Sequence, residues 1–462
     1  MRRSPLTPHG FFYALCLAAV CFGIGFAQSP APDLAHAVKQ FTLPASELAE
    51  LAKAVVTPSP SPTPTQIGNF SDRVKNLSRN APRRESITGI NVGTKYVNGL
   101  FGGMEQGAGF PFGVEFTTAD AIPGVELRAR AYLSSRLYRK FEGSIFIPKL
   151  GLDFLQAEIW YAYLRRTRDH FFGIGALAPK SNATNLDLEH RSVNATVSMK
   201  SKKGETGVYF RAFNASTYTG QNEKEPAIET LFSGSPVVVP LTRYVPGLFF
   251  NAGSNNIKTA GVGFFSELDL RNDEKGLTQG FYGYTRVGFY DRIGTLPSTA
   301  TDYNWTEIEF DGRGYVPLGS RKTSLAVRGY ADLRYAQVGK QIPVYEMPWL
   351  GGRNHLRGYQ NFRFRGNSLL LLVGELRQTV WAQKETRGVD AFVFVDNGKI
   401  WGDARSGTNP LILRNDKFAD QPLRVQPGLG VQYRFNKSFG ARLDFAKSNE
   451  RTMVYFSVSR GF

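Results

Sequence analysis

One arginine and two carboxylates are the residues most suited to form an ion-paired cluster. Arg357 lies in residues 348–366, a Gly- and Arg-rich segment between two β-like runs. Glu375 and Asp396 lie on the next two strand candidates. A guanidinium can bind two carboxylates through paired hydrogen bonds in a partly desolvated site, and removing one partner of such a set is costly. The sequence therefore offers Glu375 and Asp396 as counter-ions for Arg357.

The glycines around Arg357 indicate a loop with one demanding backbone conformation. Gly351 and Gly352 precede the arginine, and Gly358 and Tyr359 follow it. Glycine adopts left-handed backbone conformations at little cost, so this spacing predicts a long loop with a specific turn. An ordinary surface turn has the same composition, and that alternative stays open when the loop is considered by itself.

Taken together, the motifs resemble the signature of the BamA/TamA-type outer-membrane barrels, the bacterial surface antigen family. Leu350-Gly351-Gly352 and Leu356-Arg357-Gly358-Tyr359 fit the loop motif of that family, Glu375 fits the acid on the next strand, and Asp396 fits the acid of its F-x-D-x-G strand. The resemblance extends, more weakly, from about residue 107 to the C-terminus. It implies that the loop folds back into the barrel lumen, where its anchor (Gly351, Gly352, Arg357, Gly358 and Tyr359) meets its acidic partners (Glu375 and Asp396).

Composition and periodicity predict an all-β chain. Aromatic residues make up 13% of the sequence, which also contains 48 Gly, and both features favour strands and turns. In residues 306–318, Ile308 and Phe310 alternate with Glu307 and Glu309. The same alternation of apolar with polar residues occurs in 125–133, 324–334 and 429–436.

A soluble β-sandwich alternates in the same way, so periodicity does not by itself decide the fold. The context favours a transmembrane antiparallel β-barrel, because the chain has an export signal, many aromatic residues and a densely charged second face. Residues 86–462 have room for about 16 strands, the number that the family resemblance also implies. The predicted fold is such a barrel with one long loop in its lumen.

The N-terminal region predicts export. Arg2 and Arg3 precede an apolar run over 11–26, a pattern typical of a secretory signal peptide, which we expect to comprise residues 1–27. An N-terminal membrane anchor and lipidation at Cys21 are the alternatives. Both cysteines of the chain lie in this run, so the processed chain would have no disulfide and no thiolate chemistry.

Residues 28–85 contain a Pro/Ser/Thr-rich run over 57–65 and are predicted to form a largely disordered periplasmic leader. Members of the family usually carry periplasmic POTRA domains here, and this segment has neither the length nor the alternation for one. We therefore expect a barrel domain without POTRA domains.

The C-terminal residues resemble the aromatic assembly signal of outer-membrane barrels. Val454, Phe456, Val458 and the terminal Phe462 fall on one face at period two, with Arg460 as the exception. We expect Phe456, Val458 and Phe462 to form that signal. At the other end of the barrel region, the Gly-rich residues 98–113 suggest a loosely paired seam between the first and last strands.

No catalytic, cofactor or metal motif is evident. The sequence has no P-loop, no H-E-x-x-H, no G-x-S-x-G and no cysteine cluster. We expect His170, His190 and His355 to lie in loops as solvated residues. The prediction is a non-enzymatic protein without cofactor or metal.

The net charge of +17 favours anionic lipid head groups over nucleic acid for an exported chain. Arg353, Arg357, Arg363 and Arg365 form the densest basic group, so lipopolysaccharide is one expected partner. By resemblance, the activity would be protein insertion into, or translocation across, the bacterial outer membrane, with client outer-membrane proteins as partners. The alternatives are a passive or plugged channel, a structural barrel, and the membrane half of a complex whose periplasmic partner is a separate chain.

Overall fold

A computed structural model describes residues 90–93, 96–101, 104, 107–118, 123–219, 224–232, 257–272, 277–294, 302–338, 340–384, 387–402, 418–435 and 440–458. The predicted signal peptide (1–27) and leader (28–85) lie outside these residues, as does Phe462 of the predicted assembly signal.

The described residues form one large antiparallel sheet in which each strand pairs with the next one along the chain. The sheet has 17 strands, and the first of them, β1, has only four residues. The 16 strands that follow match the predicted number, and the predicted all-β class is confirmed. The bounds are β1 (Ile90–Gly93), β2 (Val97–Phe101), β3 (Pro111–Thr117), β4 (Glu126–Ser134), β5 (Arg139–Ile147), β6 (Leu155–Phe171), β7 (Thr184–Lys200), β8 (Gly204–Thr219), β9 (Ile257–Asp269), β10 (Gly280–Arg292), β11 (Asn304–Leu318), β12 (Ser320–Ala336), β15 (Ser368–Lys384), β16 (Arg387–Trp401), β17 (Arg424–Arg434), β18 (Gly440–Lys447) and β19 (Thr452–Val458).

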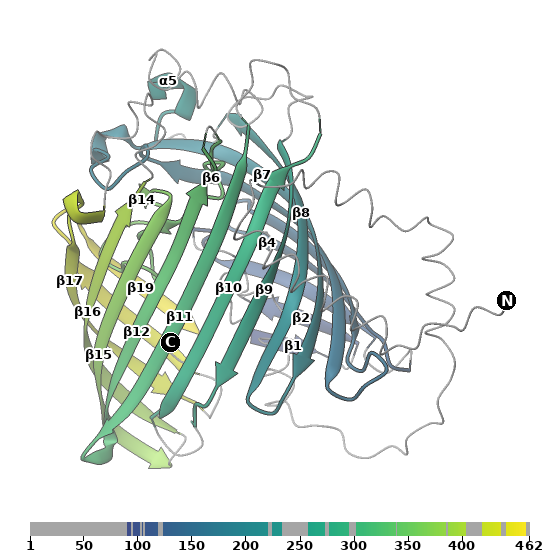
Figure 1. Ribbon diagram of the computed structural model, residues 1–462. Coiled ribbons are helices and arrows are strands. Elements are labelled where there is room, and N and C mark those ends of the chain that lie inside the picture. Colours follow the sequence, from purple (N-terminus) through teal and green to yellow (C-terminus); the bar gives the residue numbers. More distant parts are fainter. Residues whose placement is uncertain are drawn as a thin grey trace. The chain divides into compact units, whose positions relative to one another are not determined.

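These strands curve around a common interior to form a barrel (Figure 1). The short helices are α5 (Ile228–Phe232), η1 (Lys180–Asn182) and η2 (Phe418–Asp420). Within the described residues, no helix is long and apolar enough to cross a membrane. A small ribbon of β13 (Trp349–Leu350) and β14 (Phe364–Arg365) belongs to the connection between β12 and β15.

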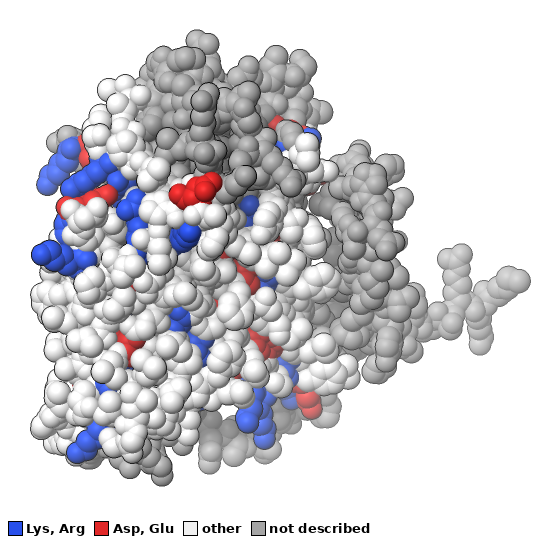
Figure 2. Space-filling view, turned by 60° about the vertical axis from the view of Figure 1, so that its left-hand side comes forward, with Lys and Arg blue, Asp and Glu red and all other residues white. Residues whose placement is uncertain are grey.

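Alternation along the strands separates an apolar outer face from a charged inner one. On β11, Ile308 and Phe310 are 37% and 47% exposed, whereas Glu307 and Glu309 are buried. Strands β12 and β17 repeat this pattern. Much of the wall in view in Figure 2 carries no charged side chain. The outer face is therefore the kind of surface that the sequence predicts for contact with lipid.

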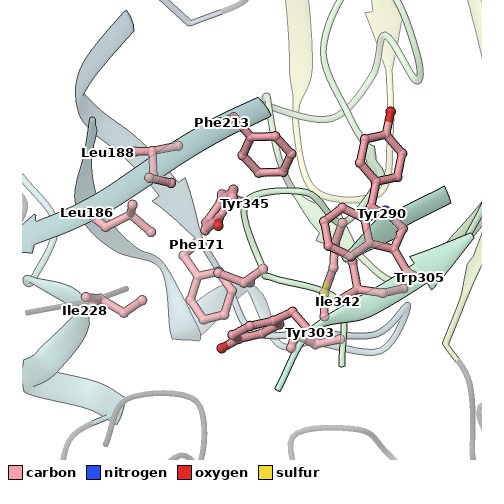
Figure 3. Packing of buried hydrophobic residues seen from close by; sticks show 14 of the residues in the cluster. Phe171, Leu186, Leu188, Phe213, Ile228, Tyr290, Tyr303, Trp305, Ile342 and Tyr345 are labelled. Atoms are coloured by element: carbon pink, nitrogen blue, oxygen red, sulfur yellow. The ribbon is translucent and has the colours of Figure 1, made fainter. Parts of the chain in front are cut away.

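Lumen-facing charges of β10, β11 and β12 are paired with one another. Arg286 on β10 lies between Glu307 and Glu309 on β11, and Asp311 pairs with Arg313 and with Arg328 on β12. Such pairing lets a barrel of this size keep charged side chains away from lipid. The interior also contains two apolar clusters, both formed by wall residues together with the connection between β12 and β15. Figure 3 shows the one that contains Tyr345 and Trp305.

The two faces give a direct test of the lipid contact. We expect Phe310→Arg, near the middle of β11, to lower the free energy of unfolding by roughly 2–4 kcal/mol, and Val316→Arg, near the end of that strand, by about 0–1 kcal/mol. The reason is that an outward charge is least tolerated deep in the bilayer. Urea unfolding in lipid vesicles measures both values. Equal effects at the two positions would contradict a lipid-facing outer wall.

Candidate functional site

The connection between β12 and β15 is a long lumen loop that we define as residues 337–367. Its tip is a tight hairpin closed by β13 and β14. Gly351 and Gly352 have φ values of 111° and 94°, a region that L-residues rarely adopt. A Cβ on Gly351 would lie only 2.1 Å from the Gln360 carbonyl oxygen. The two glycines are thus required by the turn, and the amide of Gly352 closes it by donating to the Tyr359 carbonyl at 2.9 Å.

The hairpin places Arg357 against inward-facing carboxylates of the wall. Its Nη2 lies 2.6 Å from Asp396 Oδ1 and its Nε 2.9 Å from Asp396 Oδ2, so the pair is bidentate. Its Nη1 donates to Glu375 Oε2 at 3.3 Å and to Asp444 Oδ1 at 2.9 Å. The structure therefore brings together the three residues that the sequence suggested, and adds Asp444 on β18 as a fourth.

Two wall arginines complete the cluster, which we call the Arg357 cluster. Arg442 on β18 donates to both Glu375 and Asp444, and Arg377 on β15 donates to Glu375 at 2.6 Å. Three arginines thus balance three carboxylates (Asp396, Glu375 and Asp444), and all six side chains are buried. Because every charge has a partner, the cluster avoids the large penalty of an isolated buried ion.

Aromatic rings of the wall cover the guanidinium groups of this cluster. The guanidinium carbon of Arg357 lies 3.2 Å from the centre of the Phe394 ring, and that of Arg442 lies 3.9 Å from the Phe392 ring. Arginine over an aromatic face gains a cation–π contribution that grows when the pair is desolvated. The phenylalanines that share a strand face with Asp396 are therefore part of its environment in the lumen.

The residues that follow Arg357 bind β17, β19 and the turn between β18 and β19. The amide of Gly358 donates to Gln426 Oε1 on β17 at 2.7 Å. Tyr455 on β19 donates its hydroxyl to the Tyr359 carbonyl at 3.0 Å, and the Tyr359 hydroxyl donates to Asn449 at 2.7 Å. Each of the predicted anchor residues Gly351, Gly352, Arg357, Gly358 and Tyr359 therefore lies in the hairpin, and its tip contacts every strand from β15 to β19.

Alternation does not by itself decide the direction of Glu375 and Asp396, because apolar residues share their strand faces. The structure explains this: Leu371 and Val373 on β15 also point inward, where they pack with Leu350, Leu356 and other loop residues in one cluster. The inner face of β15 is apolar where the hairpin covers it and charged at Glu375 and Arg377. The loop, rather than lipid, accounts for the apolar residues on this inner face.

Residues 169–175, at the end of β6 and just after it, support the base of the hairpin. Asp169 lies 3.6 Å from Arg365, and the amide of Gly175 donates to the Arg365 carbonyl at 2.6 Å. Arg363 stacks over the Phe172 ring at 4.7 Å and pairs with Glu450 between β18 and β19. The hairpin is thus held from β6 as well as from the C-terminal strands.

Several expectations about single residues need correction. His170 and His190 lie in β6 and β7 rather than in loops. His355 is in the lumen loop but is buried, stacked on Tyr330 at 5.4 Å. Burial, together with the nearby Arg328, lowers the pKa of His355 to about 3, so its imidazole is neutral.

The arginine group 353–365, which the sequence suggested as a lipopolysaccharide contact, lies mostly inside the barrel. Arg357, Arg363 and Arg365 are buried inside the barrel, where each contacts an acidic side chain. These three arginines therefore present no surface to lipid head groups.

The site residues predicted from the sequence did not include Asp444, Arg442 and Gln426. Arg442 and Asp444 form an Arg-x-Asp pair, the mirror of Glu375-x-Arg377, and both pairs point inward at period two. That repetition of opposite charges on one strand face is the signal that could have identified them. Of the predicted assembly signal, Phe456 is exposed on β19 and Val458 ends that strand.

Chemically, the arrangement is suited to holding a loop. The carboxylates of the Arg357 cluster are each bound by arginines, so they serve as acceptors in ion pairs. Within the described residues, no group of three or more His, Asp or Glu side chains is arranged to hold a metal ion.

The glycine requirement of the hairpin predicts a selective effect. Gly351→Ala should lower the free energy of unfolding by roughly 1–3 kcal/mol, because it combines a left-handed backbone with a collision at the Gln360 carbonyl. Gly374→Ala on β15 is the matched control, because a Cβ there would have no atom within 4 Å. The temperature at which the folded form is lost on a semi-native gel compares the two. Equal stability of both variants would show that the turn is not constrained.

Comparison with known proteins agrees with this architecture. A family profile described as the Omp85 superfamily domain matches residues 124–462. BamA from Haemophilus ducreyi, in a form lacking POTRA domains 1–3, has a similar fold with a TM-score of 0.56 and 16% identity, over 84% of this chain and 77% of that one. CdiB from Escherichia coli gives a TM-score of 0.51 and 12% identity, over 85% of this chain and 71% of that one. At such identities the likeness concerns the fold, and the predicted barrel of the BamA type is confirmed.

Proposed function

The chain belongs to the Omp85 superfamily, whose barrels reside in the bacterial outer membrane, and from this premise we propose that it inserts proteins into that membrane or translocates them across it. The observation that carries the proposal is the lumen loop, whose tip is pinned by the Arg357 cluster. A barrel with only a structural role in the membrane would not need a buried cluster of six charges to hold one hairpin in position.

The lengths of the strands support the proposal. Strands β6, β7, β12 and β15 each have 17 residues, whereas β3 has seven and β4 and β5 have nine each. Short strands near the N-terminal end of the sheet make few ladder hydrogen bonds, which agrees with the loosely paired seam that the Gly-rich residues 98–113 suggest. A weak seam would give a client strand a place to pair with the barrel edge.

The position of the hairpin relative to this seam adds a second argument. Its tip binds β17 through Gly358, β18 through Arg357 and β19 through Tyr359. Because the hairpin is attached to the last strands, it would stiffen the C-terminal side of the seam. The N-terminal side has no such attachment in this proposal. We infer that the Arg357 cluster sets the shape of the C-terminal edge to which a client would be presented.

A plugged channel is the second candidate, because the same loop occupies the lumen. Loop residues such as Leu350, Leu356 and Phe364 are fully buried against the wall. In that function the Arg357 cluster would hold a plug rather than shape an edge.

The proposed partners follow from the two faces. The apolar outer wall is proposed to contact outer-membrane lipid. Any contact with lipopolysaccharide would be made by residues other than the buried arginines of the loop. Client outer-membrane proteins, or a separate periplasmic partner, are the proposed protein partners, and nucleic acid is not among them. We propose a non-enzymatic role without a cofactor, since the carboxylates of the site are engaged in ion pairs.

Replacing Arg357 separates the two functions. If the barrel is an assembly or translocation factor, Arg357→Ala should reduce the amount of client proteins in outer-membrane fractions, because the edge loses its anchor. If it is a plugged channel, the same variant should instead raise single-channel conductance in planar bilayers and leave other membrane proteins unchanged.

Arg165→Ala is the matched control for this experiment. Arg165 binds Asp187 on the neighbouring wall strand with a 2.8 Å contact, and neither residue belongs to the Arg357 cluster. It should change neither client abundance nor conductance. Loss of clients in both variants would show that general barrel damage, not the loop anchor, is responsible.

A further inference from the structure

The part of the lumen loop that precedes the hairpin forms a separate apolar arm, residues 340–347. Ile342, Val344, Tyr345 and Met347 are all buried. A single turn orders them, with the amide of Glu346 donating to the Pro343 carbonyl at 2.8 Å. None of these residues contributes to the Arg357 cluster.

This arm packs against aromatic residues of the wall strands β8, β10 and β11, which we call the aromatic seat. The seat includes Phe213 on β8, Tyr290 on β10 and Trp305 on β11, and Tyr345 lies beside Phe213 in the same cluster (Figure 3). Tyr345 and Phe213 meet edge to face with centroids 6.3 Å apart, and Tyr290 stacks on Trp305 at 4.9 Å. An apolar seat of this kind is unusual in a barrel lumen, whose wall is ordinarily polar.

One charged residue of the arm, Glu346, is buried beside this apolar cluster. Its carboxylate accepts two hydrogen bonds from Arg211 on β8, at 3.3 and 3.1 Å, and one from Arg334 on β12 at 3.2 Å. Glu346 is 3% exposed. A buried carboxylate held by two arginines is stable only while both the arm and the wall stay in place.

The ion pairs of Glu346 reverse the polarity of the Arg357 cluster and lie on other strands. At Glu346 the loop supplies the anion and the wall supplies the cations, on β8 and β12. At Arg357 the loop supplies the cation and the wall supplies the anions, on β15, β16 and β18. Arg365 joins the two parts by donating to the Val344 carbonyl at 3.1 Å.

We propose that Glu346 is a second, independent anchor of the lumen loop, a positioning residue that holds arm 340–347 in its aromatic seat and so seals that half of the lumen. The hairpin closes on itself through β13 and β14, so it keeps its fold and its Arg357 contacts when the arm leaves. Release of the arm uncovers the aromatic seat without dismantling the hairpin. The inference does not depend on the proposed function, because it concerns which part of the loop each ion pair holds.

Differential thiol labelling of the folded barrel tests the proposal. Val344→Cys reports on the arm and Leu356→Cys on the hairpin, and both positions are buried in the wild type. The background carries Ala at Cys16 and Cys21, the two cysteines of the chain. A membrane-impermeant maleimide is applied to barrels in lipid vesicles with and without Glu346→Gln, and gel mobility of unheated samples verifies the fold.

Glu346→Gln should raise the labelling rate at Val344→Cys by ~10-fold, since the arm loses its charge pairing, and leave Leu356→Cys protected. Asp187→Asn is the matched control: it removes a buried wall carboxylate that pairs with Arg165 and should expose neither cysteine. Protection of Val344→Cys in the Glu346→Gln barrel would overturn the proposal. So would simultaneous exposure of both cysteines, because the loop would then be one unit.

Arg211→Gln removes the wall partner of Glu346 instead of Glu346 itself. It should expose Val344→Cys as well, to a smaller extent, because Arg334 still binds Glu346. If both Glu346→Gln and Arg211→Gln lose the compact barrel, Glu346 is required for barrel folding rather than for holding the arm, and the proposal is wrong.

Discussion

The structure depends on one constraint, the burial of the Arg357 guanidinium inside a barrel whose wall must supply the opposite charge. A buried ion is costly unless each of its hydrogen bonds is met. Asp396, Glu375 and Asp444 meet those of Arg357, and Arg377 and Arg442 neutralise the remaining acidic charge. Because these partners come from three different strands, the loop can enter the lumen only in one register with the wall.

This constraint links the loop to the C-terminal part of the barrel. The hairpin adds bonds from Gly358 and Tyr359 to β17 and β19, so its placement is coupled to strands far along the sequence. The proposed function needs an edge that can exchange partners, and the N-terminal strands β3, β4 and β5 have only seven to nine residues. The hairpin would keep the C-terminal edge ordered, and a weakly paired seam would let a client strand pair with that edge. These two properties are the physical basis of the proposed role.

The sequence predicted the two faces of the wall and the turn of the hairpin better than it predicted the packing inside the lumen. Alternation on residues 306–318 predicted the inward acids and outward apolar side chains of β11, since a pleated strand separates neighbours by face. The glycines of the hairpin were evident because few residues tolerate φ near 111°. Alternation alone did not give the direction of Asp396, because its apolar neighbours Phe392 and Phe394 cover arginines in the lumen rather than face lipid. The arm at 340–347 was missed for a similar reason: its apolar residues are packed inside a barrel, where local pattern predicts polar ones.

The most direct test of the account is a double-mutant cycle between Arg357→Met and Asp396→Asn, with the free energy of unfolding measured by urea titration in lipid vesicles. Each single variant leaves its partner charge buried without its main counter-ion, whereas the double variant removes both charges. The account predicts that the double variant is less destabilised than the sum of the two single variants by about 1–3 kcal/mol. Effects that add to within about 0.5 kcal/mol would contradict it, because the two residues would then not be energetically coupled.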